Sequence, residues 1–480
     1  RPASFYILIF LLTSVFCKNK NLLTCTQTIR MNRNTFIKQS ALSAAALTVL
    51  PGLAKAANSP NAKVRLAFIG CGLRGQNHID NALRRSDVDV VALCDIDDRM
   101  LGMTADIFKE RSKPLPPVFK GNEFAYRKLL EQKNIDAIII ATPWEWHCPM
   151  ILDALQAGIK YIGTEVVIGL TLDDHWEIVH EAEKQKAQVM MLENVCYRRD
   201  VMAVMNMVRQ GIFGEIIHLQ GGYQHDLRGV KFNNGIEPYN SGAEFGAKGF
   251  SEARWRTNHS VHRNGDLYPT HGIGPVAMMV DINRGNRFVS LNAFASKARG
   301  LHEYVVNKGG ANHPNAKVEF KLGDLVTTHI KCANGETILL QHDTNLPRPY
   351  SLGFRVQGTK GLWMDVNRSV YVEGVSKPHQ WDEAKPWLEK YDHPLWARWS
   401  KETEGAGHGG MDFFVLHAFV EAIKRNIPTP QDVYDAAAWS AITPLSEQSI
   451  DLGNATVDFP DFTSGQWMYR KNNFAATNEF

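Results

Sequence analysis

The sequence predicts an α/β fold, in which an N-terminal doubly wound parallel sheet over residues 62–193 precedes a C-terminal α+β domain over residues 194–480. Three observations predict it. A glycine-rich turn joins the first apolar run after the leader to a helical segment. Short apolar runs then alternate with helical patterns, which is typical of parallel sheets. Beyond residue 194 the strand-like runs alternate apolar and polar residues, which predicts a large open, mostly antiparallel sheet.

The composition is that of a globular protein, because 44% of the 480 residues are hydrophobic and 21% are charged. This length allows two or three domains with cores of their own. Residues 1–56 hold seven Lys or Arg and no Asp or Glu, so the net charge of +3 leaves −4 for the remainder. A mildly acidic globule without a basic run does not suit a polyphosphate backbone, so we expect no nucleic acid partner.

Residues 1–56 have the pattern of a leader. From Met31 the chain has a charged stretch ending at Lys38, an apolar run of small residues over 41–53, and an Ala-Lys-Ala site at 54–56. These are the three parts of a signal peptide. We interpret residues 1–30 as upstream translation. The apolar run over residues 5–16 is too short to cross a bilayer, so we expect no membrane span in the mature chain.

The signal is similar to a twin-arginine (Tat) export signal. Arg33 is followed by Phe36-Ile-Lys38, although Asn34 stands where the second arginine belongs. We therefore expect Tat-like export to the periplasm or the cell surface. An ordinary secretory signal that starts at Met31 is the alternative.

The cysteines indicate neither disulfides nor zinc. Seven occur in the chain, two of them in the leader, and the remaining five are an odd number without a C-x-x-C pair. The histidines and carboxylates also lack metal-ligand spacing, so we expect no metal site.

A dinucleotide-binding motif opens the first domain. The apolar run Val64–Ile69 leads into Gly70-Cys-Gly72-Leu-Arg-Gly75 and then a helical stretch. In this strand, glycine turn, helix order, Gly70 permits the tight turn, Gly72 admits a pyrophosphate and Gly75 allows close helix packing. Asp95 follows the second strand, Val88–Cys94, and its carboxylate suits ribose hydroxyls while repelling a 2′-phosphate, which predicts NAD rather than NADP. The alternative is a structural glycine turn with Asp95 as a strand cap.

Further strands predict where a ligand lies. Strands are expected over Ile135–Ala141, Tyr161–Glu165 and Val189–Leu192, with helices around Met150–Ala157 and over Leu172–Lys186. The carboxyl ends of parallel strands meet at one edge, where ligands bind. The residues expected at that edge are Leu73, Arg74, Asp95, Trp144, Glu145, Trp146, His147, Glu165, Val166, Glu193 and Asn194.

The C-terminal part predicts an open sheet with helices on one face. Asn334-Gly335 separates two alternating runs, Val326–Cys332 and Thr337–Gln341, which is a strong hairpin signal. Further strands are expected over 352–357 and 369–375, helices over 411–425 and 432–449, and a loop over the active site at 230–248.

These strand ends resemble the glucose–fructose oxidoreductase, inositol dehydrogenase and MocA superfamily, which joins a Rossmann domain to an α/β domain with a large open sheet. Most members have Glu-Lys-Pro where this chain has Glu165-Val166-Val167. The lysine takes part in acid–base work, so its absence argues against ordinary dehydrogenase chemistry. The superfamily often dimerises through the free sheet face, and a homodimer is carried over as an expectation.

Seven longer motifs narrow the resemblance. They are Pro143-Trp-Glu-Trp-His147, Glu193-Asn-Val-Cys-Tyr-Arg-Arg-Asp200, Gly221-Gly-Tyr-Gln-His-Asp226, Trp255-Arg-Thr-Asn-His259, Leu267-Tyr-Pro-Thr-His-Gly272, Asp281-Ile-Asn-Arg-Gly-Asn286 and Gly405-Ala-Gly-His-Gly-Gly410. They resemble glycoside hydrolase family 109, whose members are NAD-dependent α-N-acetylgalactosaminidases. The resemblance implies a retaining, redox-neutral hydrolysis in four steps: C3 oxidation, C2 deprotonation with C1 elimination, water addition and re-reduction. It also implies tightly bound NAD that is regenerated in each turnover, and a glycan substrate with α-N-acetylgalactosamine termini.

The resemblance also implies roles for individual residues. The cofactor positions are Gly70, Gly72, Leu73, Arg74, Gly75, Asp95, Trp144, Glu145, Trp146, His147, Glu165, Val166, Asn194 and Tyr268. The substrate positions are Tyr223, Arg256, Tyr268, Pro269, Thr270, His271 and Tyr350. We expect His271 and Tyr223 to be catalytic, because an imidazole titrates near working pH and a tyrosine with a lowered pKa can handle the C2 proton.

Other interpretations stay open at this stage. Tyr223, Trp144 and Trp146 are also compatible with core packing, His271 with a helix cap, and Tyr350 with aromatic packing beside Pro349. For the whole chain, the alternatives are an NAD-dependent sugar oxidoreductase that releases NADH and a non-catalytic NAD-binding protein.

Overall fold

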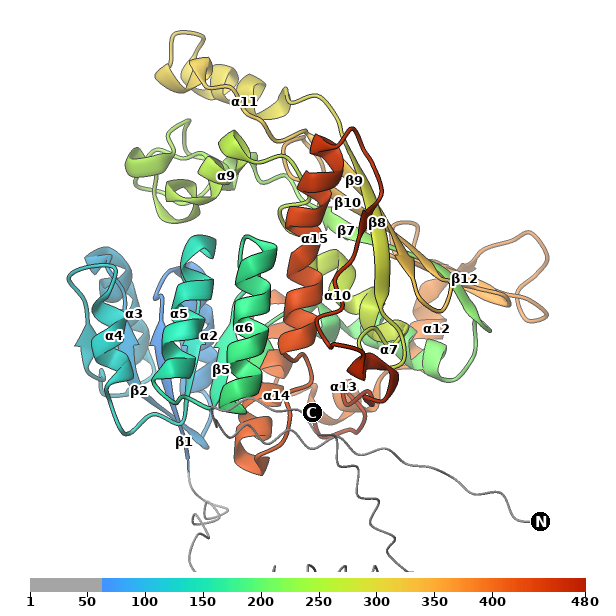
Figure 1. Ribbon diagram of the computed structural model, residues 1–480, viewed down its shortest axis with the longest axis horizontal. Helices are drawn as coiled ribbons and strands as arrows, with labels where there is room; N and C mark the ends of the chain where they lie inside the picture. Colours follow the sequence, from blue (N-terminus) through green and yellow to red (C-terminus); the bar gives the residue numbers. More distant parts are fainter. Residues whose placement is uncertain (1–62) are drawn as a thin grey trace, which may run out of the picture. The chain divides into compact units, whose positions relative to one another are not determined.

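The computed structural model describes residues 63–480 (Figure 1), so the predicted leader lies outside the described residues. The first sheet has six strands in the order β3-β2-β1-β4-β5-β6, and every neighbouring pair is parallel. Its strands are β1 (Val64–Ile69), β2 (Val88–Cys94), β3 (Val118–Phe119), β4 (Ala137–Ile140), β5 (Tyr161–Thr164) and β6 (Gln188–Met191). The predicted doubly wound sheet is confirmed.

The central strands of this sheet are almost wholly apolar, because helices cover both faces. All four residues of β4 are buried. In Figure 1, α5 (Trp144–Gln156) and α6 (Leu172–Gln185) lie in front of the sheet. Helix α2 (Leu73–Leu83) packs with α3 (Asp98–Glu110), and a short helix α4 (Ala125–Leu130) precedes β4.

The second sheet has nine strands in the order β14-β13-β12-β11-β7-β10-β9-β8-β15. Only the β7–β10 pair is parallel, so the predicted mostly antiparallel sheet is confirmed. Its strands are β7 (Ile216–Gln224), β8 (Phe288–Ala295), β9 (Leu325–Cys332), β10 (Thr337–Asp343), β11 (Arg355–Gly358), β12 (Gly361–Met364), β13 (Ser369–Val372), β14 (Asp382–Glu383) and β15 (Val457–Asp458).

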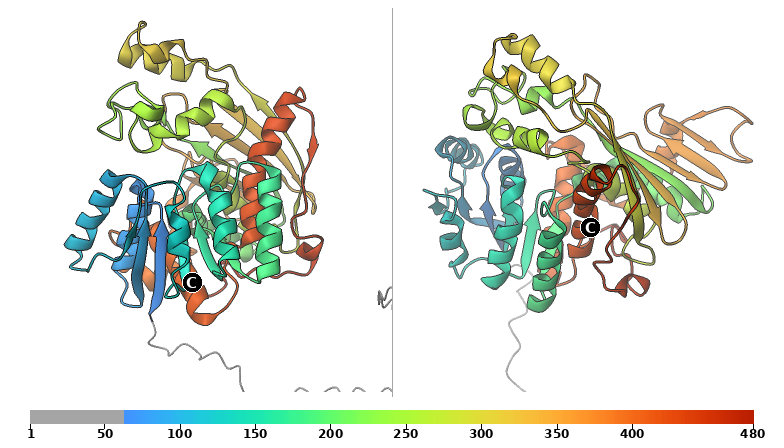
Figure 2. Two further views of the ribbon diagram at one scale, coloured as in Figure 1. Left: turned by 60° about the vertical axis from the view of Figure 1, so that its left-hand side comes forward. Right: turned by 45° about the horizontal axis from the view of Figure 1, so that its top comes forward.

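Helices from the C-terminal part join the two sheets. Helix α10 (Thr270–Met279) packs on β7, and α15 (Val433–Asp451) packs on β8, α6 and β6. Helix α14 (Met411–Arg425) packs against α2 and β1, so a helix from the end of the chain completes the first sheet's cover (Figure 2). The remaining helices are α7 (Arg199–Arg209), α8 (Arg228–Lys231), α9 (Arg256–His262), α11 (Gly300–Gly309), α12 (Ala384–Lys390) and α13 (Pro394–Trp399).

Local signals placed several elements correctly. The Asn334-Gly335 hairpin joins β9 to β10, with Gly335 at φ +109°. Helix α14 has the predicted bounds. Helix α5 begins at Trp144, earlier than the predicted start near Met150. It includes Pro149, which removes only one backbone hydrogen bond close to the start of the helix. The predicted strand from residue 352 begins only at Arg355.

The predicted loop at 230–248 contains the end of α8 and one 3-10 turn, Gly246–Lys248. Together with the residues that follow it up to Arg254, it reaches the first sheet's carboxyl edge. Arg99 donates to the Ile236 carbonyl at 2.6 Å, and Arg254 pairs with Asp97 at 3.0 Å. This segment therefore covers the edge at which ligands bind in parallel sheets.

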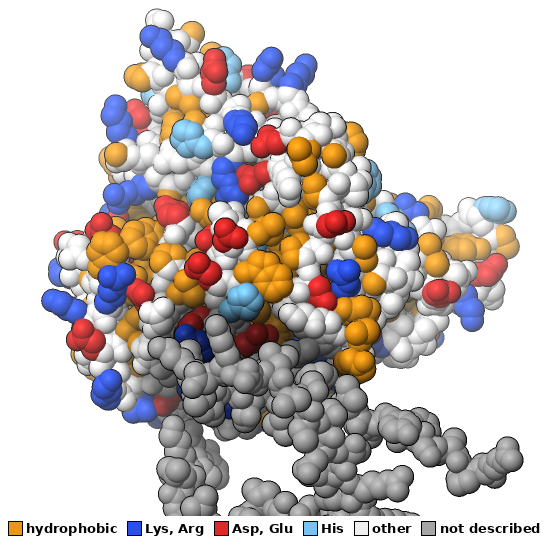
Figure 3. Space-filling model, in the orientation of Figure 1, with side chains coloured by type: hydrophobic (Ala, Val, Ile, Leu, Met, Phe, Trp, Pro, Cys, Tyr) orange, Lys and Arg blue, Asp and Glu red, His pale blue; other side chains and the backbone are white. Residues whose placement is uncertain are grey.

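The surface matches the charge expected from the sequence. On the face shown in Figure 3, acidic and basic side chains are interspersed, without a field of one sign. Cysteines 71, 94, 148, 196 and 332, the five in the described residues, are free and buried. No described helix combines the length and apolarity that crossing a bilayer requires, and residues 63–480 contain no cluster of three or more metal-ligating side chains.

Candidate active site

The glycine loop between β1 and α2 is closed on two sides and open on one. A Cβ at Gly70 would lie 2.4 Å from the Ala141 carbonyl oxygen, and one at Gly75 would lie 2.1 Å from the Gly70 carbonyl oxygen. A Cβ at Gly72, by contrast, meets nothing within 4 Å. Gly72 is also the N-cap of α2, and no side chain caps this helix. The first N–H groups of α2 therefore face a cradle suited to a phosphate.

Asp95 braces this loop from the end of β2. Its Oδ2 accepts a hydrogen bond from the Cys71 amide at 2.6 Å, and its Oδ1 accepts one from the Asp97 amide at 2.8 Å. Burial raises the pKa of Asp95. An open glycine backbone, an uncapped helix start and a carboxylate at the next strand end are the groups that hold a dinucleotide, so these residues fit NAD.

Arg74 lies at the centre of a buried ionic network. Its guanidinium contacts Glu165 Oε1 at 2.7 Å and Asp412 Oδ1 at 2.9 Å. Glu165 also contacts His78 Nε2 at 2.6 Å. Burial acts to raise the pKa of Glu165, but the Arg74 charge and the His78 contact outweigh it and lower this pKa to about 2. Glu165 is therefore ionised at neutral pH.

Asp412 ties this network to the C-terminal part of the chain. It accepts a hydrogen bond from the Asn194 amide at 2.7 Å and lies 2.6 Å from His408 Nδ1. Sequence reasoning did not select Asp412, although it lies two residues after the Gly405–Gly410 motif. Arg74 and Asn194 both contact Asp412, and Arg74 also contacts Glu165, so three residues that were predicted separately as cofactor residues belong to one network.

The Trp144–His147 motif divides between the site and its support. Trp144 packs against Trp255, His259 and Tyr268, with ring centroids 5.1, 4.9 and 5.9 Å away. The other three residues of the motif have different neighbours: Glu145 lies 3.5 Å from His259, Trp146 packs edge-on to Phe124, and His147 lies between the carbonyls of Val167 and Thr142 at 2.5 and 2.8 Å.

His147 and Val166 are both buried, with 0% and 3% exposure. In this structure they lie beneath the carboxyl edge of the first sheet, where the cofactor is expected. Through the Thr142 and Val167 carbonyls, His147 connects the loops that follow β4 and β5. Their direct contact with NAD stays a prediction.

A histidine–carboxylate pair stands at the start of α10. His271 Nδ1 lies 2.8 Å from both oxygens of Glu193, a fully buried residue that follows β6. An ionised carboxylate can only accept, so Nδ1 carries the proton and Nε2 is left as the acceptor. Pro269 and Thr270 form the helix start that positions His271, and Thr270 is fully buried.

Aromatic rings surround this pair. Tyr223 stacks on Tyr268 at 4.5 Å, and both rings lie edge-on to His271 at 5.1 and 4.8 Å. The Tyr223 hydroxyl lies 3.1 Å from His225 Nδ1. Burial raises the pKa of Tyr223, while the Arg256 charge acts against that rise. The predicted catalytic residues His271 and Tyr223 are thus neighbours, from α10 and β7.

Arg256 is held over the aromatic wall. Its guanidinium carbon lies 5.0, 5.2 and 5.2 Å from the ring centroids of Trp144, Trp255 and Tyr268. Its Nε lies 2.5 Å from Glu252 Oε2. Tyr350 lies farther out, half exposed, with its ring edge-on to His225 at 4.9 Å.

Sequence reasoning placed Glu193 at the ligand-binding edge but assigned it no role in the site. The signal was present, because Glu193 directly follows a buried strand within a quoted motif. Its partner His271 is 78 residues away in the chain, so the spacing alone did not reveal the pair.

Comparison with known proteins identifies the family. The family model described as glycosyl hydrolase 109, C-terminal domain, matches residues 197–469. This chain belongs to glycoside hydrolase family 109. A second model, described as oxidoreductase family, NAD-binding Rossmann fold, matches residues 64–193 of this family 109 chain. The predicted family and superfamily are therefore confirmed, and the protein is a glycosidase with an NAD-binding domain.

Relatives and solved structures agree with this assignment. A glycosyl hydrolase family 109 protein of Stenotrophomonas maltophilia is 59% identical over 94% of this chain and 99% of that protein. An alpha-N-acetylgalactosaminidase of Tannerella forsythia is 54% identical over 88% of this chain and 91% of that protein. An NAD-binding oxidoreductase from Klebsiella pneumoniae has a TM-score of 0.62 at 15% identity, covering 84% of this chain and all of that one, which shows the shared fold.

Proposed function

We propose that this family 109 enzyme hydrolyses terminal α-N-acetylgalactosamine residues by a redox-neutral route that uses bound NAD. The observation that carries the proposal is the His271–Glu193 pair beside the stacked Tyr223 and Tyr268 rings, at the edge where the NAD-binding sheet presents its strand ends. The Tannerella relative, named an alpha-N-acetylgalactosaminidase, supports the choice of sugar.

The glycine loop and the neighbouring strand ends suit NAD binding. The Gly72 backbone and the start of α2 would take the pyrophosphate, and Asp95 would take the adenosine ribose. Arg74, Trp144 and Tyr268 lie further along the same edge. When bound, NAD supplies a reversible hydride acceptor for the sugar C3, which makes the neighbouring C2–H acidic.

His271 is positioned to act as the base at the sugar C3 hydroxyl. Glu193 holds its Nδ1–H, which orients the ring and leaves Nε2 to accept the hydroxyl proton. The buried carboxylate also stabilises the imidazolium that results. Because His271 retains 17% side-chain exposure while Glu193 has none, the ring faces the site and the carboxylate lies behind it.

Tyr223 is positioned for the C2 proton. Its hydroxyl has one ring-nitrogen neighbour, His225, at 3.1 Å. Burial alone disfavours the tyrosinate, so the Arg256 charge is needed to make Tyr223 an effective base. Arg256 also suits the negative charge that develops on the sugar during C2 deprotonation.

The carboxylates around the site do not suit a conventional displacement. Most glycosidases use two carboxyl groups that flank the scissile bond. Here Glu193 contacts His271, and Glu165 and Asp412 both contact Arg74. Such partnered groups are poor candidates for a free acid and nucleophile, which supports the elimination route.

The test is hydrolysis of 4-nitrophenyl α-N-acetylgalactosaminide in deuterated water, with NMR of the product. We expect cleavage, deuterium at C2 and no net NADH. Cleavage without deuterium would replace the elimination route by direct displacement. Steady release of NADH without cleavage would instead establish a sugar oxidoreductase, the function that Val166 in place of lysine argues against.

We also propose Tat-like export to the periplasm or cell surface, on the pattern of residues 31–56. Cell fractionation of the wild type and of Arg33→Gln tests it, because loss of the arginine is expected to retain the protein in the cytoplasm. Secretion of that variant at the wild-type level would favour an ordinary secretory signal.

A homodimer through the open sheet face is proposed as well. Phe294, His329 and Leu339 lie on one face of the neighbouring strands β8, β9 and β10, where His329 pairs with Leu339 and with Asn292, two residues before Phe294. All three are partly or largely exposed. Light scattering of the purified protein is expected to give twice the chain mass, and a monomer would exclude this assembly.

A further inference from the structure

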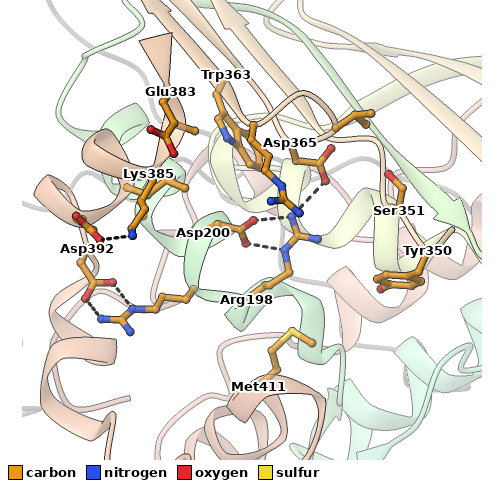
Figure 4. Close-up of a pocket in the computed structure, with 18 of the residues that line it drawn as sticks. Arg198, Asp200, Tyr350, Ser351, Trp363, Asp365, Glu383, Lys385, Asp392 and Met411 are labelled. Carbon is orange, nitrogen blue, oxygen red and sulfur yellow. Dashed lines mark hydrogen bonds and ion pairs between the residues drawn. The ribbon is translucent and has the colours of Figure 1, made fainter.

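A large groove with charged side chains in its lining lies beside the site but outside the chemistry described above. It has a volume of about 1130 Å³ and is lined by α7, β12, α12 and the loops at 348–351 and 408–411. Figure 4 shows the side chains that line the groove, which come from these elements and surround one space. All lining residues fall between 198 and 411, so the groove belongs to the family 109 part of the chain and not to the NAD-binding sheet. This placement points to the substrate rather than the cofactor.

Two lining residues connect the groove to the proposed active site. Tyr350 lines the groove and contacts His225, whose Nδ1 lies 3.1 Å from the Tyr223 hydroxyl. His408 also lines the groove and contacts Asp412, the partner of Arg74. The groove therefore adjoins the proposed substrate residues at Tyr350 and the ionic network of Arg74 at His408.

The charges in the groove balance. Five basic and five acidic side chains line it, and many are already paired. Arg198 contacts Asp200 at 2.6 Å and Asp365 at 3.2 Å, and Arg199 contacts Asp392 at 2.7 Å (Figure 4). A surface built for an acidic ligand would show an excess of positive charge. A balanced set of fixed donors and acceptors suits neutral hydroxyl groups instead.

The aromatic content agrees with a sugar ligand. The Tyr350 side chain is 50% exposed where the groove meets the site, so it offers an open ring beside polar groups. Pockets for small ligands measure about 300–1,000 Å³. The groove exceeds what one monosaccharide occupies, and the proposed function places the sugar that is cleaved beside Tyr223 and His271.

We propose that this groove binds the leaving-group part of the substrate, a neutral saccharide chain of at least two units joined to the sugar that is cleaved. The inference rests on the proposed function and extends it from the terminal sugar to the glycan that carries it. Tyr350 then serves as the junction between the two sites, and the Arg198 and Arg199 ion pairs line another part of the groove. Specificity for the glycan, as distinct from the terminal sugar, is set there.

The test compares two substrates with the same terminal sugar. In 4-nitrophenyl α-N-acetylgalactosaminide the leaving group is small and leaves most of the groove empty, whereas α-N-acetylgalactosaminyl-(1→3)-lactose fills it. Val366→Trp places a bulky ring at a groove residue that is 67% exposed, and Lys385→Ala removes an exposed groove cation. Val375→Trp, at a residue 70% exposed outside the groove, and Lys377→Ala are the matched controls.

We expect Val366→Trp to lower kcat/KM for the trisaccharide about 10-fold and Lys385→Ala about 3-fold, the effect of losing one or two hydrogen bonds. The aryl glycoside should change less than about 2-fold, and both controls should resemble the wild type. Equal losses of kcat/KM on both substrates, or no loss on either, would contradict the proposal that the groove binds the leaving group. Titration of the wild type with lactose followed by NMR gives an independent measure, and Val366→Trp should weaken this binding. Lactose binding without hydrolysis of either substrate would contradict the proposed function and would still support saccharide binding in the groove.

Discussion

Glu193 holds His271 through both carboxylate oxygens, each 2.8 Å from Nδ1, and Glu193 itself is fully buried. The geometry fixes the tautomer of the histidine and leaves Nε2 as the proton acceptor. A carboxylate in this place orients the base without contacting the sugar, so Glu193 is a positioning residue.

Glu193→Gln is expected to lower kcat about 10²- to 10³-fold, because the amide no longer enforces the reactive tautomer or stabilises the imidazolium. Glu193→Asp should recover part of the activity, since it restores the charge. NAD affinity, followed by protein fluorescence, should stay near the wild-type value in both. Equal activity of the Gln and Asp variants would contradict the positioning role.

Tyr223→Phe removes the hydroxyl and keeps the ring that stacks on Tyr268 at 4.5 Å. We expect kcat to fall about 10²-fold, because the C2 proton loses its acceptor. A transient rise in absorbance at 340 nm should persist, since C3 oxidation does not need this hydroxyl. Tyr469→Phe, at an exposed tyrosine outside the site, is the matched control. Loss of the transient in Tyr223→Phe would assign the residue to the oxidation step instead.

Gly72→Ala tests the phosphate cradle. A Cβ at Gly72 meets nothing within 4 Å, so the variant should fold with an unchanged Tm in the absence of NAD. The added methyl group would occupy the space that the pyrophosphate needs, and NAD affinity should fall by about 10-fold or more. Gly102→Ala, equally free of contacts, is the control and should bind NAD normally. Normal NAD binding by Gly72→Ala would place the pyrophosphate elsewhere.

The pH dependence of stability follows from Glu165. Its pKa in the folded protein is about 2, below the ordinary value of 4.5, because Arg74 and His78 outweigh the effect of burial. A lowered carboxyl pKa stabilises the fold above the unfolded pKa, and that stability is lost as the pH falls from about 4.5 toward 2. Urea unfolding should show a shallower loss over this range in Glu165→Gln than in the wild type. Parallel pH curves for the two proteins would contradict the assignment.

Several features followed from short stretches of sequence. Val64–Ile69, the glycine loop and Asp95 after Val88–Cys94 predicted the NAD-binding edge, and Asn334-Gly335 predicted the β9–β10 hairpin. The physical reason is locality. Side-chain periodicity, the φ freedom of glycine and the chemistry of turns depend on residues that adjoin one another in the chain.

Other features depended on the tertiary structure. The chain brings Glu193 to His271 and Asp412 to Arg74 across long separations, and it places α14 from the C-terminal end against β1. No local pattern encodes these contacts, because burial of apolar faces decides which helices pack together and only then which polar side chains meet. The sequence determined the fold class, the cofactor loop and the family, whereas the packing of α10, α14 and the second sheet decided the partners of each catalytic group.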